Sequence, residues 1–127
     1  MVRVTGIGGV FIKSKDAKSL AAWYEKHLGI NFGGQSYTAF KWDDPNNGSA
    51  EGQTVFSFFK QESDYFAPSN GPFMINFRVK DLDALMAVLK EEGVTIHGEV
   101  ANYEGMGKFG WIIDPEGNKV ELWEPAD

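Results

Sequence analysis

The sequence contains no cysteine, which excludes disulfides, thiolate metal sites and cysteine nucleophiles. A chain without cysteine suits a reducing compartment, and we expect a cytoplasmic location. Histidine is almost as scarce, because only His27 and His97 are present. Neither has a second histidine or a carboxylate at the spacing of a metal site, so surface or capping roles are favoured for both.

Long apolar runs and excess positive charge are also missing. No apolar stretch approaches the roughly 18 residues of a membrane-spanning helix, and no charged-then-apolar leader stands at the N-terminus. The formal net charge of −6 argues against nucleic acid and anionic membranes as partners. Apolar residues are plentiful at 43%, and aromatic residues at 14% include ten phenylalanines. The 127 residues fit one domain, 1–127, with its own core.

Two segments share a strand-then-helix pattern. Residues 9–16 read GVFIKSKD and residues 74–81 read MINFRVKD, and both alternate before running into helical periodicity. Asp16 and Asp81 stand where a side-chain oxygen can accept from the first free amide groups of a helix. The pattern predicts a helix after each aspartate.

The two predicted helices also match in length and position. Gly29 and Gly93 follow their last periodic residues and are typical helix ends. An offset of 65 carries Asp16 to Asp81 and Leu20 to Leu85. We therefore interpret the chain as an internal repeat.

Further strands are predicted after each helix, separated by turn-forming residues. The fold class is α+β, built from two βαβββ modules at about 1–60 and 73–127 with a linker at 61–72. The predicted strands are 30–33, 36–42 and 53–60 in the first module, and 94–98, 107–113 and 118–124 in the second.

Three stretches carry a family resemblance: GVFIKSKDAKSLAAWYEKHLGI, MINFRVKDLDALMAVLKEEGV and FGWIIDPEGNKVELWEP. Their order and content resemble the vicinal oxygen chelate superfamily, which includes glyoxalase I, extradiol dioxygenases and bleomycin-resistance proteins. The resemblance covers nearly the whole chain and is not specific for one activity. It implies curved mixed sheets that form a cavity, and a homodimer.

The resemblance also implies a divalent cation held by the first and last strands of each module. The ligand positions then fall on Gly9, Phe56, Met74 and Glu121, an assignment that the offset of 65 supports. Among these only Glu121 can bind an oxygen-preferring cation. We therefore expect no metal and no other cofactor.

Strand alternation predicts which side chains face the cavity, because successive residues point to opposite faces. Residues an even number of positions from a ligand position on the same strand should face the cavity, and they form the candidate site. Trp111 is added from a middle strand, for which the pattern does not show which side chains face the cavity. The loop 99–108 is interpreted either as a mobile lid that closes with Tyr103 and Met106 over the ligand or as an ordinary solvent loop. The predicted ligand-binding residues are Phe11, Phe56, Phe58, Met74, Asn76, Arg78, Tyr103, Trp111, Glu121 and Trp123. The opposite parity, predicted to face the helices, comprises Val10, Ile12, Val55, Ile75, Phe77, Val79, Val120 and Leu122.

Three functional classes remain open. The first is a small-molecule-binding protein, akin to bleomycin-resistance proteins, that holds an amphipathic or aromatic ligand in the cavity. The second is a lyase, isomerase or dioxygenase that uses Glu121 as catalytic base or partial metal ligand. The third is an interaction-bearing dimer whose aromatic rings simply fill the core.

Overall fold

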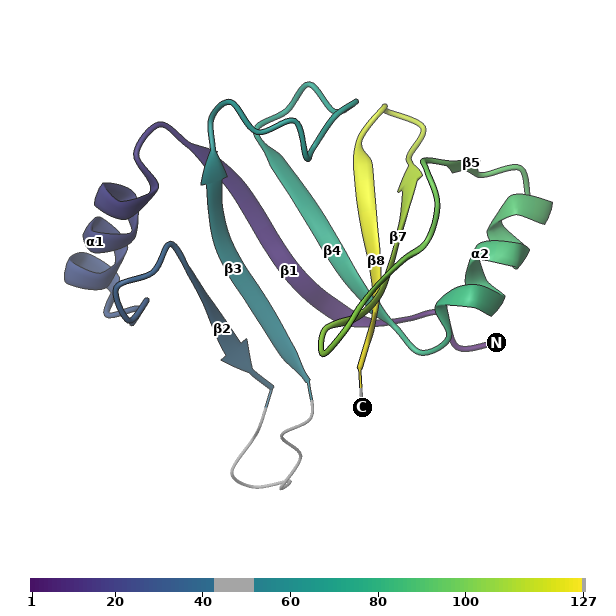
Figure 1. The fold of residues 1–127 in the computed structure, drawn as a ribbon, viewed down its shortest axis with the longest axis horizontal. Helices are drawn as coiled ribbons and strands as arrows, with labels where there is room; N and C mark the ends of the chain where they lie inside the picture. Colours follow the sequence, from purple (N-terminus) through teal and green to yellow (C-terminus); the bar gives the residue numbers. More distant parts are fainter. Residues whose placement is uncertain (43–51, 127) are drawn as a thin grey trace.

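The computed structural model describes residues 1–42 and 52–126. Its first half, shown in Figure 1, contains β1 (Val4–Ser14), α1 (Ala17–Leu28), β2 (Tyr37–Lys41) and β3 (Gln53–Lys60). Its second half contains β4 (Phe73–Val79), α2 (Leu82–Glu91), β5 (Thr95–Ile96), β6 (Ala101–Tyr103), β7 (Gly107–Ile113) and β8 (Lys119–Pro125).

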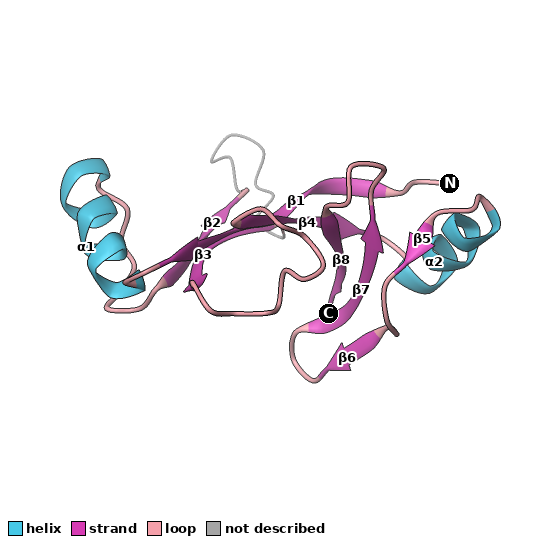
Figure 2. Cartoon of the chain, turned by 90° about the horizontal axis from the view of Figure 1, so that it is seen from above, coloured by secondary structure: helices cyan, strands magenta, loops and turns pink. Residues whose placement is uncertain are grey.

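The strands form one mixed sheet in the order β2-β3-β1-β4-β8-β7-β5, with β6 also paired to β7. Within each half the first and last strands are parallel, β1 with β3 and β4 with β8. The antiparallel pair β1–β4 joins the two halves within one chain. Figure 2 shows the sheet as a curved, unclosed layer with α1 and α2 at its opposite ends. The α+β class with curved sheet is therefore confirmed.

Both helices begin at the predicted aspartates. Asp16 Oδ1 accepts from the Ser19 amide at 3.1 Å, and Asp81 Oδ1 accepts from the Ala84 amide at 3.2 Å. These bonds satisfy amide groups that have no partner within the helix. At the other end of α1, Gly29 adopts a left-handed conformation with φ 70°, which glycine tolerates without steric cost.

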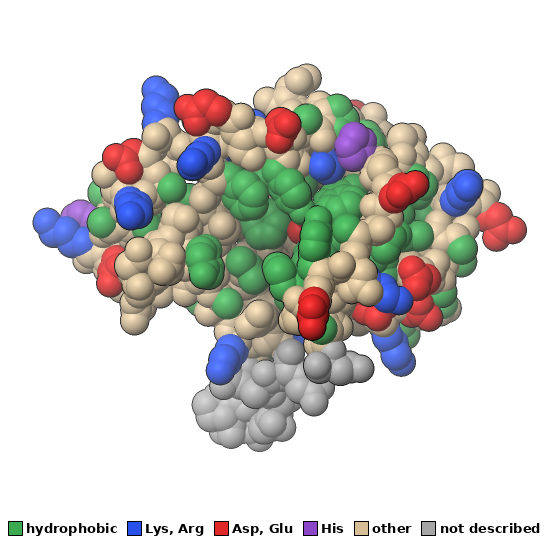
Figure 3. Space-filling view, in the orientation of Figure 1, with side chains coloured by type: hydrophobic (Ala, Val, Ile, Leu, Met, Phe, Trp, Pro, Cys, Tyr) green, Lys and Arg blue, Asp and Glu red, His purple; other side chains and the backbone are tan. Residues whose placement is uncertain are grey.

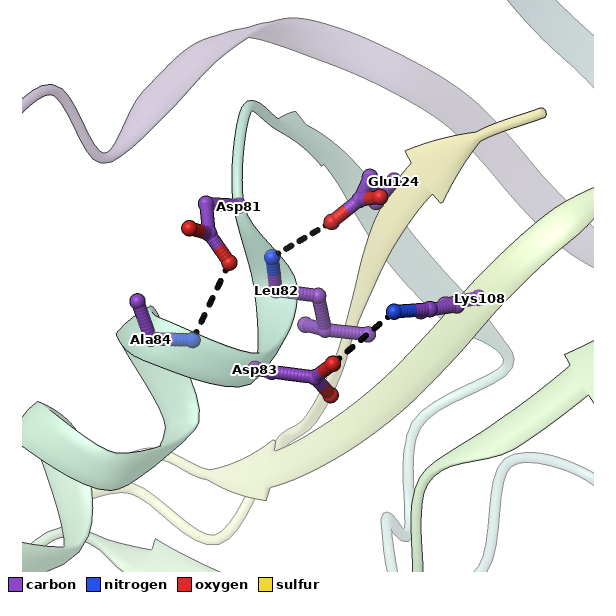
Figure 4. Close-up of polar contacts among 6 residues, drawn as sticks. All are labelled: Asp81, Leu82, Asp83, Ala84, Lys108 and Glu124. Atoms are coloured by element: carbon purple, nitrogen blue, oxygen red, sulfur yellow. Dashed lines mark hydrogen bonds and ion pairs between the residues drawn. The ribbon is translucent and has the colours of Figure 1, made fainter. Parts of the chain in front are cut away.

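The start of α2 is also attached to the sheet by side chains from β7 and β8 (Figure 4). Glu124 Oε1 accepts from the Leu82 amide at 2.8 Å, which places a carboxylate at the positive end of the helix. Lys108 Nζ lies 2.8 Å from Asp83 Oδ2. These contacts link the first turn of α2 to the two strands beneath it.

Each helix covers its own part of the core. Under α2 the buried side chains are aliphatic: Val79, Leu82, Leu85 and Leu122. Under α1 they are mainly aromatic, with Phe32 and Phe58 packed around Ala21. A third cluster lies on the other face of the sheet and contains Phe11, Phe66 and Met74.

The predicted strand 30–33 does not form. Ile30 and Phe32 alternate as strand residues do, but both pack against the α1 cluster. The backbone then turns at Gly33 and Gly34, whose φ values of 58° and 82° are incompatible with a strand. In the second half β5 has only two residues, and β6 forms within the stretch 99–108 predicted as a loop.

Candidate functional site

A cavity of about 380 Å³ opens on the concave face of the sheet. Figure 3 shows apolar side chains gathered around a hollow in the middle of this face. The linker 61–72 and the β6–β7 hairpin each contribute residues to its walls. The lining residues are Gly8, Phe11, Val55, Phe59, Tyr65, Asn76, Tyr103, Met106, Phe109, Glu121 and Trp123.

The predicted alternation agrees with the structure on β1, β4 and β8. Phe11, Asn76, Glu121 and Trp123 all line the cavity. Their opposite-parity neighbours pack beneath the helices, as Leu122 does under α2. The sequence pattern therefore placed the floor of the cavity correctly on these three strands.

On β3 the predicted alternation is wrong. Phe56 and Phe58 pack under α1, where the Phe56 ring stacks on Tyr24 with centroids 5.6 Å apart. Val55 and Phe59, which lie on the opposite face of the strand, line the cavity instead. Phe56 and Phe58 therefore belong to the core of the first half and not to the site.

The strand register explains this correction. Phe11 pairs with Ser57, and Asn76, which is 65 positions after Phe11, pairs with Glu121. The counterpart of Glu121 is thus Ser57, at an offset of 64 (121 − 57), and not Phe56. A change of one residue moves every side chain of a strand to the other face. The first strands of the two halves, β1 and β4, are thus related by an offset of 65, and the last strands, β3 and β8, by an offset of 64.

Glu121 is the centre of a buried hydrogen-bond network. Its Oε2 accepts from the Tyr65 hydroxyl at 2.6 Å and from Trp111 Nε1 at 2.8 Å. Its Oε1 accepts from Asn76 Nδ2 at 2.7 Å. The residue is 2% exposed, and three donors compensate for the loss of water around its carboxylate. They also fix its orientation.

The linker enters this network through Tyr65. Burial and the adjacent Glu121 carboxylate both raise the pKa of Tyr65 above its usual range, so its hydroxyl stays protonated and acts as a donor. Lys119 Nζ donates to the Tyr65 carbonyl oxygen at 2.7 Å and lies over the Tyr65 and Trp111 rings. Burial lowers the pKa of Lys119, an effect that the nearby Glu121 and Asp64 oppose.

The other predicted site residues lie around the cavity. Met74 is 1% exposed and packs with Phe11 and Phe66. Trp111 contacts the site through its bond to Glu121. Tyr103 lines the cavity from β6.

Arg78 lies apart from these residues, beside a neighbouring hollow that shares the walls Val55, Met106 and Trp123. Its guanidinium lies 5.6 Å from the centroid of the Trp42 ring. Arg78 therefore does not take part in the Glu121 network that forms the cavity floor.

The donor set does not fit the divalent cation that the superfamily resemblance implies. Within residues 1–42 and 52–126, no group of three or more His, Cys, Asp or Glu side chains is placed to hold a metal ion. Glu121 is surrounded by the donors Tyr65, Trp111 and Asn76, and a cation would have to displace N–H or O–H groups that point at the carboxylate. The described side chains around Glu121 therefore do not form a site for a divalent cation.

Sequence reasoning missed two polar residues of the site, Tyr65 and Lys119. Tyr65 lies in a stretch whose many turn formers indicate only a linker. The consecutive aromatic residues Tyr65 and Phe66 were the available signal, because such a pair is unusual in a solvated connection. Lys119 shares strand parity with Glu121 and Trp123, so alternation along β8 could have identified it.

The fold and the site together define a small α+β protein with a largely apolar cavity and a hydrogen-bonded carboxylate in its wall. The profile of the Glyoxalase/Bleomycin resistance protein/Dioxygenase superfamily matches residues 6–122. The chain therefore belongs to this superfamily. A comparison with curated proteins finds no match.

Solved structures with the same fold include several epimerases. Methylmalonyl-CoA epimerase from Mycobacterium tuberculosis is 26% identical, with a TM-score of 0.64, 98% of this chain and 90% of that chain covered. A variant of Streptomyces coelicolor methylmalonyl-CoA epimerase, in complex with 2-nitronate-propionyl-CoA, is 21% identical, with a TM-score of 0.69 and coverages of 98% and 99%. A superfamily member from Vibrio splendidus 12B01 is 12% identical, with a TM-score of 0.55 and coverages of 98% and 99%.

Proposed function

We propose that this protein binds a small apolar, aromatic or amphipathic molecule in the cavity on the concave face, without a metal ion or other cofactor. The observation that carries the proposal is the combination of an aromatic wall with a Glu121 carboxylate already held by three protein donors. Apolar cavities with a few fixed polar groups are typical of small-molecule sites. The predicted ligand-binding role of the lining residues is part of this proposal.

The first test is direct binding of a small aromatic probe, 2-naphthol, by isothermal titration calorimetry. We expect saturable binding with one site per chain. Val55→Phe extends a larger side chain into the cavity and should weaken binding at least tenfold. Val100→Phe is the matched control, because Val100 is 40% exposed and does not line the cavity. If 2-naphthol does not bind the parent protein, the proposal fails.

The second test is metal content after purification and dialysis. We expect no stoichiometric divalent metal, because Gly9 and Met74 offer no ligand for an oxygen-preferring cation and Ser57, the counterpart of Glu121, offers only a neutral hydroxyl. Elemental analysis that finds about one Zn, Ni, Mn or Fe per chain would contradict this part of the proposal.

An enzyme is the second candidate, favoured by the similarity to methylmalonyl-CoA epimerases and by a carboxylate that lines the cavity. In this case Glu121 would be the catalytic base of an isomerase or lyase, acting through Oε1, which accepts only one hydrogen bond from the described side chains. The test is exchange of the methylmalonyl-CoA α-proton in deuterated buffer, followed by mass spectrometry. Exchange that Glu121→Gln abolishes would favour this class, while exchange at the buffer rate would reject this substrate.

A homodimer and a cytoplasmic location complete the proposal. The edge strand β2 carries Tyr37 and Phe40, which are 54% and 47% exposed. Exposed edge strands with apolar side chains are usually covered in folded proteins. Light scattering at micromolar concentration should give twice the chain mass, and a monomer mass would contradict the dimer.

No helix among the described residues is long and apolar enough to cross a membrane.

A further inference from the structure

One buried polar atom in the cavity wall has no partner. Asn76 is 2% exposed and lines the cavity, and its Oδ1 is buried without a hydrogen bond to any described group. It lies against Gly8, where even a Cβ atom would collide with it. A buried acceptor left unpaired is unfavourable, so a donor supplied from outside the protein would bind there favourably.

Glu121 fixes which atom of the Asn76 amide is left unpaired. Asn76 Nδ2 donates to Glu121 Oε1 at 2.7 Å. Rotating the amide by 180° would place Oδ1 against the carboxylate, where two acceptors repel each other. The charge of Glu121 therefore keeps an oxygen, and not an NH₂ group, at the wall beside Gly8.

Among the described residues that line the cavity, every buried side-chain donor atom already makes a hydrogen bond within the protein. Tyr65, Trp111 and Asn76 donate to Glu121, and Trp123 Nε1 donates to the Met106 carbonyl oxygen at 2.8 Å. Tyr103 is 48% exposed and lies at the mouth. Among the described residues, the one buried side-chain atom left without a partner is thus an acceptor, Asn76 Oδ1, and it lies beside the Glu121 carboxylate. The Lys119 ammonium is directed to the Tyr65 carbonyl oxygen and does not line the cavity.

We infer that the cavity selects aromatic or aliphatic molecules that carry an N–H or O–H donor, neutral or cationic, and rejects those that bring an anion to its wall. This inference rests on the proposed function and narrows its ligand class. A donor can pair with Asn76 Oδ1 and with the remaining lone pair of Glu121 Oε1. A carboxylate has no hydrogen to offer to Asn76 Oδ1 and would face the buried charge of Glu121.

The test compares three probes with the same naphthalene body. 2-Naphthol carries a donor, 2-methoxynaphthalene carries only an acceptor, and 2-naphthoate carries a negative charge. By calorimetry with the parent protein we expect 2-naphthol to bind at least tenfold more tightly than 2-methoxynaphthalene, and 2-naphthoate to bind most weakly.

The variant Glu121→Gln should reduce the preference for 2-naphthol. The side-chain amide that the substitution introduces can accept from Tyr65 and Trp111 with its oxygen and donate with its NH₂ group to Asn76. Asn76 must then rotate to accept, and its own NH₂ group replaces the oxygen at the cavity wall. We expect 2-methoxynaphthalene and 2-naphthoate to gain relative to 2-naphthol. Glu116→Gln, which removes the same charge from an exposed turn, should leave the parent preference unchanged.

The outcomes separate the two proposals. If none of the probes binds, the proposed function fails and this inference fails with it. If all three bind the parent equally, or 2-naphthoate binds most tightly, the cavity is a binding site but this inference is wrong. If the parent shows the expected order and Glu121→Gln leaves the preference for 2-naphthol unchanged, that preference arises from probe hydrophobicity, which also overturns the inference.

Discussion

Phe11 and Ser57 in the first half of the sheet occupy the places that Asn76 and Glu121 take in the second half. In the first half this pair carries no charge, and Phe11 is buried against the Phe59 ring with centroids 5.3 Å apart. In the second half the same positions form the buried hydrogen-bond network. The two halves therefore share a backbone arrangement but not the chemistry of these positions, because the buried carboxylate and amide of the candidate site both come from the second half.

The two helices also differ in how they are attached to the sheet. Leu82 and Leu85 of α2 are buried, whereas only Ala21 of α1 is. The first turn of α2 is also bound to Glu124 and to Lys108 by side-chain contacts. The second half thus holds its helix more firmly, and it is also the half that carries the carboxylate network. We interpret this as a rigid support for the polar wall of the cavity.

The largest expected difference between the halves is in helix packing. Leu20 and Leu85 are related by the offset of 65, but Leu85 is 3% exposed and Leu20 is only half-buried. Leu85→Ala should lower the free energy of unfolding by about 3 kcal/mol, because it leaves a cavity in a closed core. Leu20→Ala should cost about 1 kcal/mol. Urea denaturation measures both, and equal losses would show that the two helices are equally anchored.

The second prediction concerns the close approach between the halves at Gly8. A Cβ atom there would collide with Asn76 Oδ1 and lie 2.9 Å from Trp123 Cε3. Gly8→Ala should destabilise the protein by about 2 kcal/mol, since β1 or the network must shift. Gly71→Ala is the matched control, because its Cβ atom would meet Phe73 at an ordinary 3.5 Å. Thermal unfolding that does not separate the two variants would contradict the close packing.

A smaller effect is expected from Tyr65→Phe, which removes one donor to Glu121 and leaves the ring in place. The loss should be roughly 1–2 kcal/mol, because the acceptor is a buried charge. Tyr103→Phe, at a residue that is 48% exposed, should change stability little. Chemical denaturation at pH 7 distinguishes the two variants.

The raised pKa of Tyr65 predicts that the stability of the protein depends on pH. The pKa of Tyr65 in the folded protein is raised above the ordinary value of 10.0. The folded state therefore holds the hydroxyl proton more tightly than the unfolded state does. The stability that this gives is fully present below about pH 10 and is lost as the pH rises further. Tyr65→Phe should lack this decline, and a parent-like decline in the variant would assign it to other groups.

The smallest expected effect concerns the β6–β7 hairpin, which we still predict to act as a lid. Its tip carries Tyr103 and Met106, which are about half exposed and line the cavity. The Met106 carbonyl oxygen accepts from Trp123 Nε1 and from the Ala126 amide, so the backbone of the tip is attached to the C-terminal segment. We therefore expect only a few-fold slowing of amide hydrogen exchange in residues 99–108 on saturation with 2-naphthol. Unchanged exchange would remove the lid.

Much of the fold was predictable because its signals are local. Asp16 and Asp81 marked the helix starts, and alternation identified β1, β3, β4, β7 and β8. The strand predicted at 30–33 failed because burial of Ile30 and Phe32 imitates strand alternation, while two glycines bend the backbone away from the sheet. Short-range patterns report burial, and they do not report which backbone group pairs with which.

The candidate site was only partly predictable. The position of Glu121 in a cavity wall followed from its place between Val120 and Leu122 in an otherwise apolar strand. The expected ligand positions set Glu121 beside Met74 on the neighbouring strand, whereas the register pairs it with Asn76, two residues further along β4. The sequence did not predict which side chains of β3 face the cavity. A shift of one residue between the halves places Val55 on the cavity face and Phe56 on the opposite face. Such a shift leaves no trace in composition or periodicity.

The sequence by itself determined the repeat, the helix caps, the superfamily and the single carboxylate of the cavity wall, because each depends on residue type and near-neighbour spacing. The tertiary structure alone decided that Tyr65 from the linker and Trp111 from β7 meet Glu121, and that Asn76 Oδ1 is left without a partner. These contacts join residues far apart in the chain, with Tyr65 and Glu121 separated by 56 positions. Only the curvature of the sheet and the path of the linker bring them within hydrogen-bonding distance.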